Sequence, residues 1–202
     1  MIMKIAAILI WNLLFFDPVD ISVEKWIIEK TSNLSIEGKS NVNTFKCDIV
    51  EYLKEDTIFL YKDNGVHQPS SIVKGGLTIN TNRFDCHQNH ITTDLKKTLK
   101  SKENGWMKIN LLTLGYLHPH SQQQVVKGKV EIQLAGVTKT IEIDYRVEQR
   151  GDGGLYLVGI RKLLFSDFGL IPPSKLAGLI KVDQEIKVSF YLLLRPATTK
   201  RT

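Results

Sequence analysis

Cysteine is scarce in this sequence, with two residues among 202, so a disulfide-dense scaffold is excluded. Aromatic residues make up 8% of the chain, and no block of basic residues is interleaved with them. Nucleic-acid binders usually gather such residues on one face, so we expect no nucleic-acid partner despite a formal net charge of +6. Six prolines and fourteen glycines exclude a collagen-like repeat.

Enzyme motifs are also missing. The sequence contains no G-x-S-x-G elbow, phosphate-binding loop or dinucleotide fingerprint, and Gly151–Gly154 predicts a hairpin turn. His87 and His90 form one close pair, and His118 and His120 form another. Zinc needs three or four converging ligands, which two separate pairs do not supply. We therefore expect neither a metal site nor an enzyme.

The amino terminus is typical of a secretory signal peptide, because Lys4 is followed by an apolar run over residues 5–16. That run is too short to span a bilayer, and no later segment is apolar enough. We predict a signal peptide over residues 1–22, with an uncertain cleavage site, and a periplasmic or secreted protein. A buried amino-terminal strand or helix is the alternative. After the signal peptide we predict one domain over residues 23–197 and a disordered tail over residues 198–202.

Most of the predicted domain has the pattern of β-strands. Residues 130–134 and 141–147 alternate apolar with polar side chains around Ala135 and Gly136, which predicts a β-hairpin. Residues 186–194 and 155–165 predict further strands, as do short segments before residue 114. Regular short strands separated by turn residues indicate an all-β barrel or sandwich.

Two segments instead predict short helices. Residues 92–102 place Leu95 and Leu99 four apart among lysines, and Thr93 is a candidate cap. Residues 172–180 have two prolines near a possible first turn.

The two cysteines occur in matching Phe-x-Cys segments, as Cys47 and Cys86. Two cysteines in an exported protein often pair, which predicts a Cys47–Cys86 disulfide. Two buried free thiols are the alternative that the sequence leaves open.

The order of several short segments resembles the YceI-like family of exported lipocalin-like proteins. The most specific pieces are Ser40-Asn-Val-Asn-Thr-Phe45 and Gly136-Val-Thr-Lys139, with Phe84-Asp-Cys86 and Phe168-Gly-Leu170 at the expected places. The resemblance spans about residues 24–195. It implies an extended, antiparallel eight-stranded lipocalin-like β-barrel with one or two short helices. The ligand that it implies is a polyisoprenoid or an isoprenoid quinone, with no other cofactor.

Alternation within the strands then selects the side chains that face the barrel interior. The residues predicted to form an apolar cavity wall are Phe45, Cys47, Ile132, Leu134, Ile141, Ile143, Phe190 and Leu192. Alternation separates inward from outward positions but does not separate a cavity wall from ordinary core packing.

The sequence thus favours an exported, non-enzymatic protein that holds a long isoprenoid lipid. A structural or stress-response barrel without a dedicated ligand is the alternative. The ligand's identity, the pathway and the formation of a homodimer are left open.

We predict that the mature protein lacks the leader, because Lys4 and the apolar run after it are typical export signals. Amino-terminal sequencing of protein isolated from cells, together with cell fractionation, tests this. A cytosolic protein that still begins at Met1 would contradict it.

Overall fold

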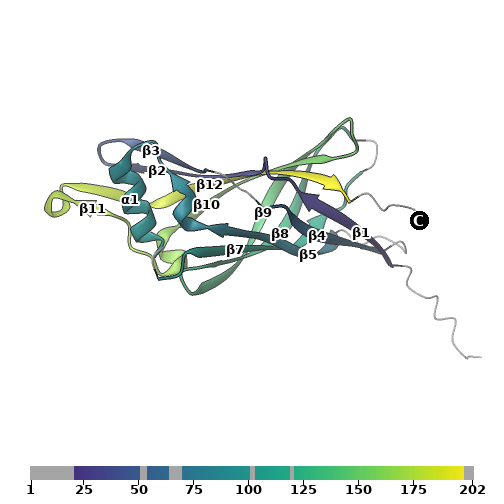
Figure 1. Ribbon diagram of the computed structural model, residues 1–202, viewed down its shortest axis with the longest axis horizontal. Helices are drawn as coiled ribbons and strands as arrows, with labels where there is room; N and C mark the ends of the chain where they lie inside the picture. The colour runs from purple at the N-terminus through teal and green to yellow at the C-terminus, as the bar shows by residue number, and fades with distance from the viewer. Residues whose placement is uncertain (1–20, 51–53, 64–69, 101–102, 119–120, 198–202) are drawn as a thin grey trace, which may run out of the picture.

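The computed structural model describes residues 21–50, 54–63, 70–100, 103–118 and 121–197 as an elongated, closed β-structure (Figure 1). The predicted tail lies outside these residues. The predicted leader does too, except for Ile21 and Ser22, which are the first residues of β1.

The described residues form twelve strands, one α-helix and three short 3-10 helices. The strands are β1 (Ile21–Ile28), β2 (Asn33–Ser40), β3 (Thr44–Ile49), β4 (Asp56–Asp63), β5 (Ser70–Asn80), β6 (Phe84–Asp85), β7 (Trp106–Gly115), β8 (Gln123–Leu134), β9 (Val137–Gln149), β10 (Leu155–Leu164), β11 (Ser174–Lys175) and β12 (Ile180–Pro196). The helices are α1 (Asn89–Thr98), η1 (Thr81–Arg83), η2 (Phe165–Phe168) and η3 (Leu176–Gly178). None of the helices described is long and apolar enough to cross a membrane.

Eight strands close into a ring in the order β1-β4-β5-β7-β8-β9-β10-β12, and β12 pairs with β1 to complete it. Every pairing in the ring is antiparallel. The predicted all-β, eight-stranded antiparallel barrel is confirmed.

The two ends of the ring differ. At one end, here called the termini end, β12 pairs with β1 through Leu194 and Pro196. Toward the other end β12 pairs with β2, which continues into β3 and β6. The backbone N–H of Glu29 and the hydroxyl of Ser32 bond to the backbone of Leu193, which bridges the break between β1 and β2. The second end carries α1 and β11 and is called the helix end (Figure 1).

Alternation along β8 and β9 is as predicted. Ile141, Ile143 and Tyr145 are buried, while Glu142 and Asp144 are exposed. The two-residue turn at Ala135 and Gly136 has positive φ at both positions, which matches the twist of a hairpin. The Gly151–Gly154 turn joins β9 to β10, also as predicted.

Tyr145 is buried inside the ring, between Gly128 of β8 and Gly159 of β10. A Cβ atom at Gly128 or Gly159 would lie 2.9 or 2.7 Å from its aromatic ring, so only glycine leaves room for the tyrosine. The ring is 2% exposed, and this burial raises the pKa of the Tyr145 hydroxyl.

The predicted helix over residues 92–102 exists, but α1 begins three residues earlier and ends at Thr98. Thr93 does not cap it, because its hydroxyl donates to the carbonyl of Asn89, one turn back within the helix.

The predicted α-helix over residues 172–180 is wrong. Leu176 and Ala177 have positive φ, and the backbone N–H of Val182 donates to the carbonyl of Pro173. The segment is therefore a hairpin arm of β11 and the start of β12. Its leucines contact no buried surface that would stabilise a helix, since Leu176 and Leu179 are both exposed.

The predicted disulfide is confirmed, and the alternative of two free thiols is not what the structure contains. Asp48 pairs with Asp85 and Ile49 with Phe84, so the antiparallel register brings Cys47 opposite Cys86. The bond joins β3 to the segment that leads into α1.

We predict that Cys47→Ser with Cys86→Ser lowers the free energy of unfolding by roughly 3–4 kcal/mol, because the 39-residue loop is no longer closed in the unfolded chain. Urea unfolding without reductant measures this. The unchanged protein in reductant should approach the variant's midpoint. Two cysteines that alkylate freely in native, unreduced protein would contradict the bond.

Candidate ligand-binding site at the helix end

An apolar cavity of about 40 Å³ lies inside the ring beneath α1. Every side chain that lines it is apolar. They are Leu34, Ile36, Phe84, Leu95, Leu99, Met107, Ile109, Ile132, Leu134, Leu163, Leu164, Phe165, Phe168, Leu170, Ile186, Val188 and Phe190.

Leu95 of α1 and Leu99, the residue that caps the carboxyl end of α1, cover this cavity and lie four residues apart on one face. On the opposite side, η2 follows β10 and contributes Phe165 and Phe168. Both leucines and both phenylalanines are buried.

A groove of about 130 Å³ lies outside the cavity, between the β2–β3 turn, α1 and the β11 arm. Leu95 and Phe165 line both the groove and the cavity, so they separate the two spaces. The groove has a polar rim that includes His90 and the ion pair between Asp94 and Lys175, whose atoms are 2.7 Å apart.

The Ser40–Phe45 segment forms one wall of this groove. The Ser40 hydroxyl accepts from the backbone N–H groups of Val42 and Asn43, which fixes the turn between β2 and β3. The Asn41 side chain donates to the carbonyl of Leu179 and accepts from the N–H of Lys181. The turn is thereby fastened to the β11 arm.

The Gly136–Lys139 segment supports the cavity from the opposite side. Lys139 donates to the carboxylate of Asp167, and this carboxylate also accepts from the backbone N–H of Leu164. These two bonds hold the pKa of Asp167 below its usual 3.8, with the Lys139 bond contributing most. The ion pair fixes η2, and hence Phe165 and Phe168, against the start of β9.

The start of α1 is fixed in a similar way. The Asp85 carboxylate accepts from the backbone N–H of His87 and from the Thr92 hydroxyl, and these bonds lower the pKa of Asp85. The Thr92 hydroxyl also accepts from the N–H of Cys86. One aspartate and the disulfide therefore hold the segment between β6 and the helix.

The predicted wall residues are distributed along the whole ring rather than gathered at one site. Ile132, Leu134 and Phe190 line the cavity, and Leu192 lines a second void of about 10 Å³. Phe45 lines the outer groove instead. Ile141 and Ile143 are buried among the core residues, and Cys47 is buried in the disulfide. Their roles in ligand binding stay predictions.

Sequence reasoning missed most of the lining. Met107 with Ile109, and Ile186 with Val188, show the same period-two alternation as the residues that were selected. The spacing of Leu95 and Leu99 predicts a helix, but it does not indicate that the two side chains line a cavity. No comparable local pattern marks Phe165 and Phe168, which reach it only because η2 folds back under β9.

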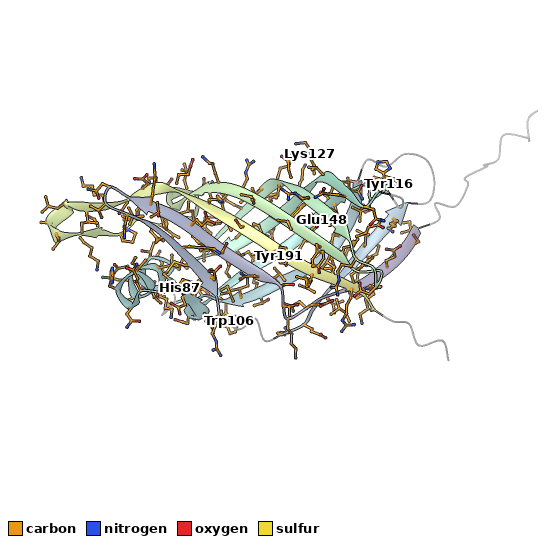
Figure 2. All side chains as sticks on the ribbon, turned by 90° about the horizontal axis from the view of Figure 1, so that it is seen from above. His87, Trp106, Tyr116, Lys127, Glu148 and Tyr191 are labelled. Atoms are coloured by element: carbon orange, nitrogen blue, oxygen red, sulfur yellow. A yellow bond between two sulfur atoms is a disulfide. The ribbon has the colours of Figure 1, made fainter. Side chains whose placement is uncertain are left out.

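The histidine pairs do not converge into a metal site within the described residues, where no three His, Cys, Asp or Glu side chains meet. His118 packs against the Tyr116 ring instead, at 4.9 Å between centroids. His67 and His120 lie outside the described part of the chain. Figure 2 shows His87 near α1 and Tyr116 toward the termini end.

Acid is expected to loosen the helix end. Because the folded-state pKa of Asp167 is lowered, the stability that this carboxylate contributes is present above about pH 4 and is lost as the pH falls through its folded pKa. We predict that Asp167→Asn lowers the thermal midpoint at neutral pH and makes its decline below about pH 4 shallower.

Lys139→Gln removes the same ion pair from the other side and should give the same shallower decline. Thermal unfolding followed by circular dichroism at a series of pH values measures all three proteins. Identical acid profiles for the two variants and the unchanged protein would contradict the role of this pair.

No protein-family model matches the chain, and no curated protein matches it. Solved structures do. A polyisoprenoid-binding domain from Saccharophagus degradans, implicated in plant cell wall breakdown, is 9% identical with a TM-score of 0.59, over 85% of this chain and 98% of that one. BcnA of Burkholderia cenocepacia is 14% identical with a TM-score of 0.60, over 83% and 96%.

These two likenesses cover nearly the whole length of both solved chains, and their low identities make them informative about fold alone. The strand ring described above is thus shared with a domain whose structure is described as polyisoprenoid-binding. The fold that the resemblance to YceI-like proteins implies is confirmed, and the chain has the fold of the polyisoprenoid-binding domain.

Proposed function

We propose that this chain is an exported, non-catalytic protein that binds a long apolar isoprenoid lipid, of polyprenyl or quinone type, at its helix end. The observation that carries the proposal is an interior cavity with a wholly apolar lining, separated from an external groove by Leu95 and Phe165. The shared fold with a domain described as polyisoprenoid-binding supports it.

The size of the cavity sets how binding must occur. Pockets that enclose ligands usually measure roughly 300–1,000 Å³, whereas this cavity measures about 40 Å³. A lipid chain therefore enters by displacing α1, which withdraws Leu95 and Leu99 from the interior and joins the cavity to the groove. The lipid then occupies the helix half of the ring, because the apolar cavity lies beneath α1.

Hydrophobic burial drives this exchange. Each Å² of lipid surface removed from water contributes about 25 cal/mol, against the cost of exposing the two leucines and of ordering a flexible chain. The polar rim at His90, Asp94 and Lys175 contacts the headgroup, which stays at the groove.

A second candidate is an exported structural or stress-response barrel without a dedicated ligand. The small volume of the cavity favours it, because a packed interior stabilises a barrel without any ligand. The two candidates differ in what an additional large side chain does at the cavity wall.

We predict that Leu134→Trp reduces the isoprenoid lipid that co-purifies from the source cells by roughly tenfold, which corresponds to about 1.4 kcal/mol. Leu134 lines the cavity at the end of β8, next to the hairpin turn, so a larger side chain there extends into lipid space. Organic extraction with mass spectrometry measures the lipid, and thermal unfolding measures stability.

The control is Val125→Trp, which adds the same side chain to β8 at an exposed position near the termini end. It should retain lipid at the level of the unchanged protein. The carrier proposal fails if the unchanged protein contains no lipid and Leu134→Trp lowers the thermal midpoint strongly, because a larger side chain overpacks an interior without ligand space. In that case the structure supports the second candidate, a structural or stress-response barrel without a dedicated ligand.

A further inference from the structure

The β11 arm forms the extreme tip of the helix end (Figure 1). It exposes large apolar side chains, since Leu176 is 67% and Leu179 is 74% exposed. Val42, in the adjacent β2–β3 turn, is 62% exposed. Three exposed aliphatic side chains thus belong to two neighbouring segments of the tip.

This exposure is fixed by the backbone. Leu176 and Ala177 have φ of 51° and 52°, and Gly178 continues the left-handed turn at 94°. Left-handed backbone is costly for residues other than glycine, so a leucine at position 176 is not explained by the conformation of the turn. Asn41 makes three hydrogen bonds to the arm, two to Lys181 and one to Leu179, which keep it from folding back.

The tip is also basic. Residues 39–44 and 171–183 contain Lys39, Lys175 and Lys181. Lys39 pairs with Asp183 at 3.5 Å and Lys175 pairs with Asp94 at 2.7 Å, so the excess positive charge of the tip is that of Lys181. Lys181 has no ion-pair partner among the residues that the structure describes. The aliphatic part of a lysine side chain is long enough to keep the ammonium group in water while the leucines beside it contact an apolar surface.

We propose that this tip, defined as Val42, Leu176 and Leu179 with Lys39, Lys175 and Lys181, docks onto the surface of an anionic lipid membrane. The aliphatic side chains enter the boundary between headgroups and acyl chains, and the lysines contact anionic headgroups. A protein partner fits less well, because stable protein interfaces bury about 800 Å² per partner and need a broader surface than a hairpin tip.

Docking in this way places the groove against the membrane, because Lys175, Ile180 and Val182 belong both to the arm and to the groove lining. If the proposed function holds, lipid passes between bilayer and cavity without crossing water. The docking itself does not depend on that function.

Flotation of the purified protein with vesicles tests the proposal. The probes are vesicles of phosphatidylcholine alone and vesicles containing about 30% phosphatidylglycerol, at about 0.05 M and about 0.5 M salt. We expect binding to the anionic vesicles and weaker binding at the higher salt. Equal binding to both kinds of vesicle, or no binding to either, overturns the proposal.

The test variant is Leu176→Ser with Leu179→Ser, which should lower partition into anionic vesicles by roughly tenfold. Lys181→Gln should lower it by about fivefold at low salt and much less at high salt. The matched control is Val125→Ser, which is 70% exposed but lies near the termini end. All of these positions are exposed, so thermal midpoints should not change, and a control that binds as weakly as the leucine variant overturns the proposal.

Two further measurements separate this proposal from others. Sedimentation without vesicles shows whether the leucine variant dissociates a dimer, and that result would make the tip a contact between copies and overturn membrane docking. Lipid content by mass spectrometry tests the proposed function independently. A protein without lipid that still binds anionic vesicles through its leucines contradicts the carrier function alone.

Discussion

The pairing of β12 with two different partners is the constraint on which the rest of the structure depends. One edge of this seventeen-residue strand pairs with β10, and the other pairs with β2 and then with β1. A single uninterrupted partner would make both ends of the ring alike. The break at Glu29 and Ser32 instead lets the sheet close tightly at the termini end and continue into β3 and β6 at the helix end.

The helix end is consequently closed by side chains rather than by strand pairing alone. The helix α1 covers it with Leu95 and Leu99, and η2 supports it with Phe165 and Phe168. Apolar contacts of this kind are not directional, so they are easier to exchange for a lipid chain than a ladder of backbone hydrogen bonds is. This difference is why the proposed entry route lies beneath the helix.

Polar groups position these apolar covers without entering the cavity. Asp85 fixes the approach to α1, Asp167 with Lys139 fixes η2, and Asn41 fixes the β11 arm. Each makes its hydrogen bonds at the rim, where the desolvation cost of a charged or amide group is modest. The interior can therefore be wholly apolar while the parts around it keep defined places.

The sequence by itself determined what local periodicity and local turns can encode. Alternation predicted the strands and the inward face of Ile132, Leu134, Ile141 and Ile143, and the short glycine-containing link at Ala135 and Gly136 predicted the β8–β9 hairpin. The matching Phe-x-Cys segments predicted a disulfide that the β3–β6 register then explains.

Only the tertiary structure decided how deep along the barrel each inward residue lies, so Leu134 lines the cavity while Ile143 packs near Tyr145. It also decided that residues 172–180 form an arm instead of a helix, because the hydrogen bonds from Asn41 come from more than 130 residues away. Period two specifies a face, whereas depth, volume and long-range hydrogen bonds depend on all strands of the closed ring at once.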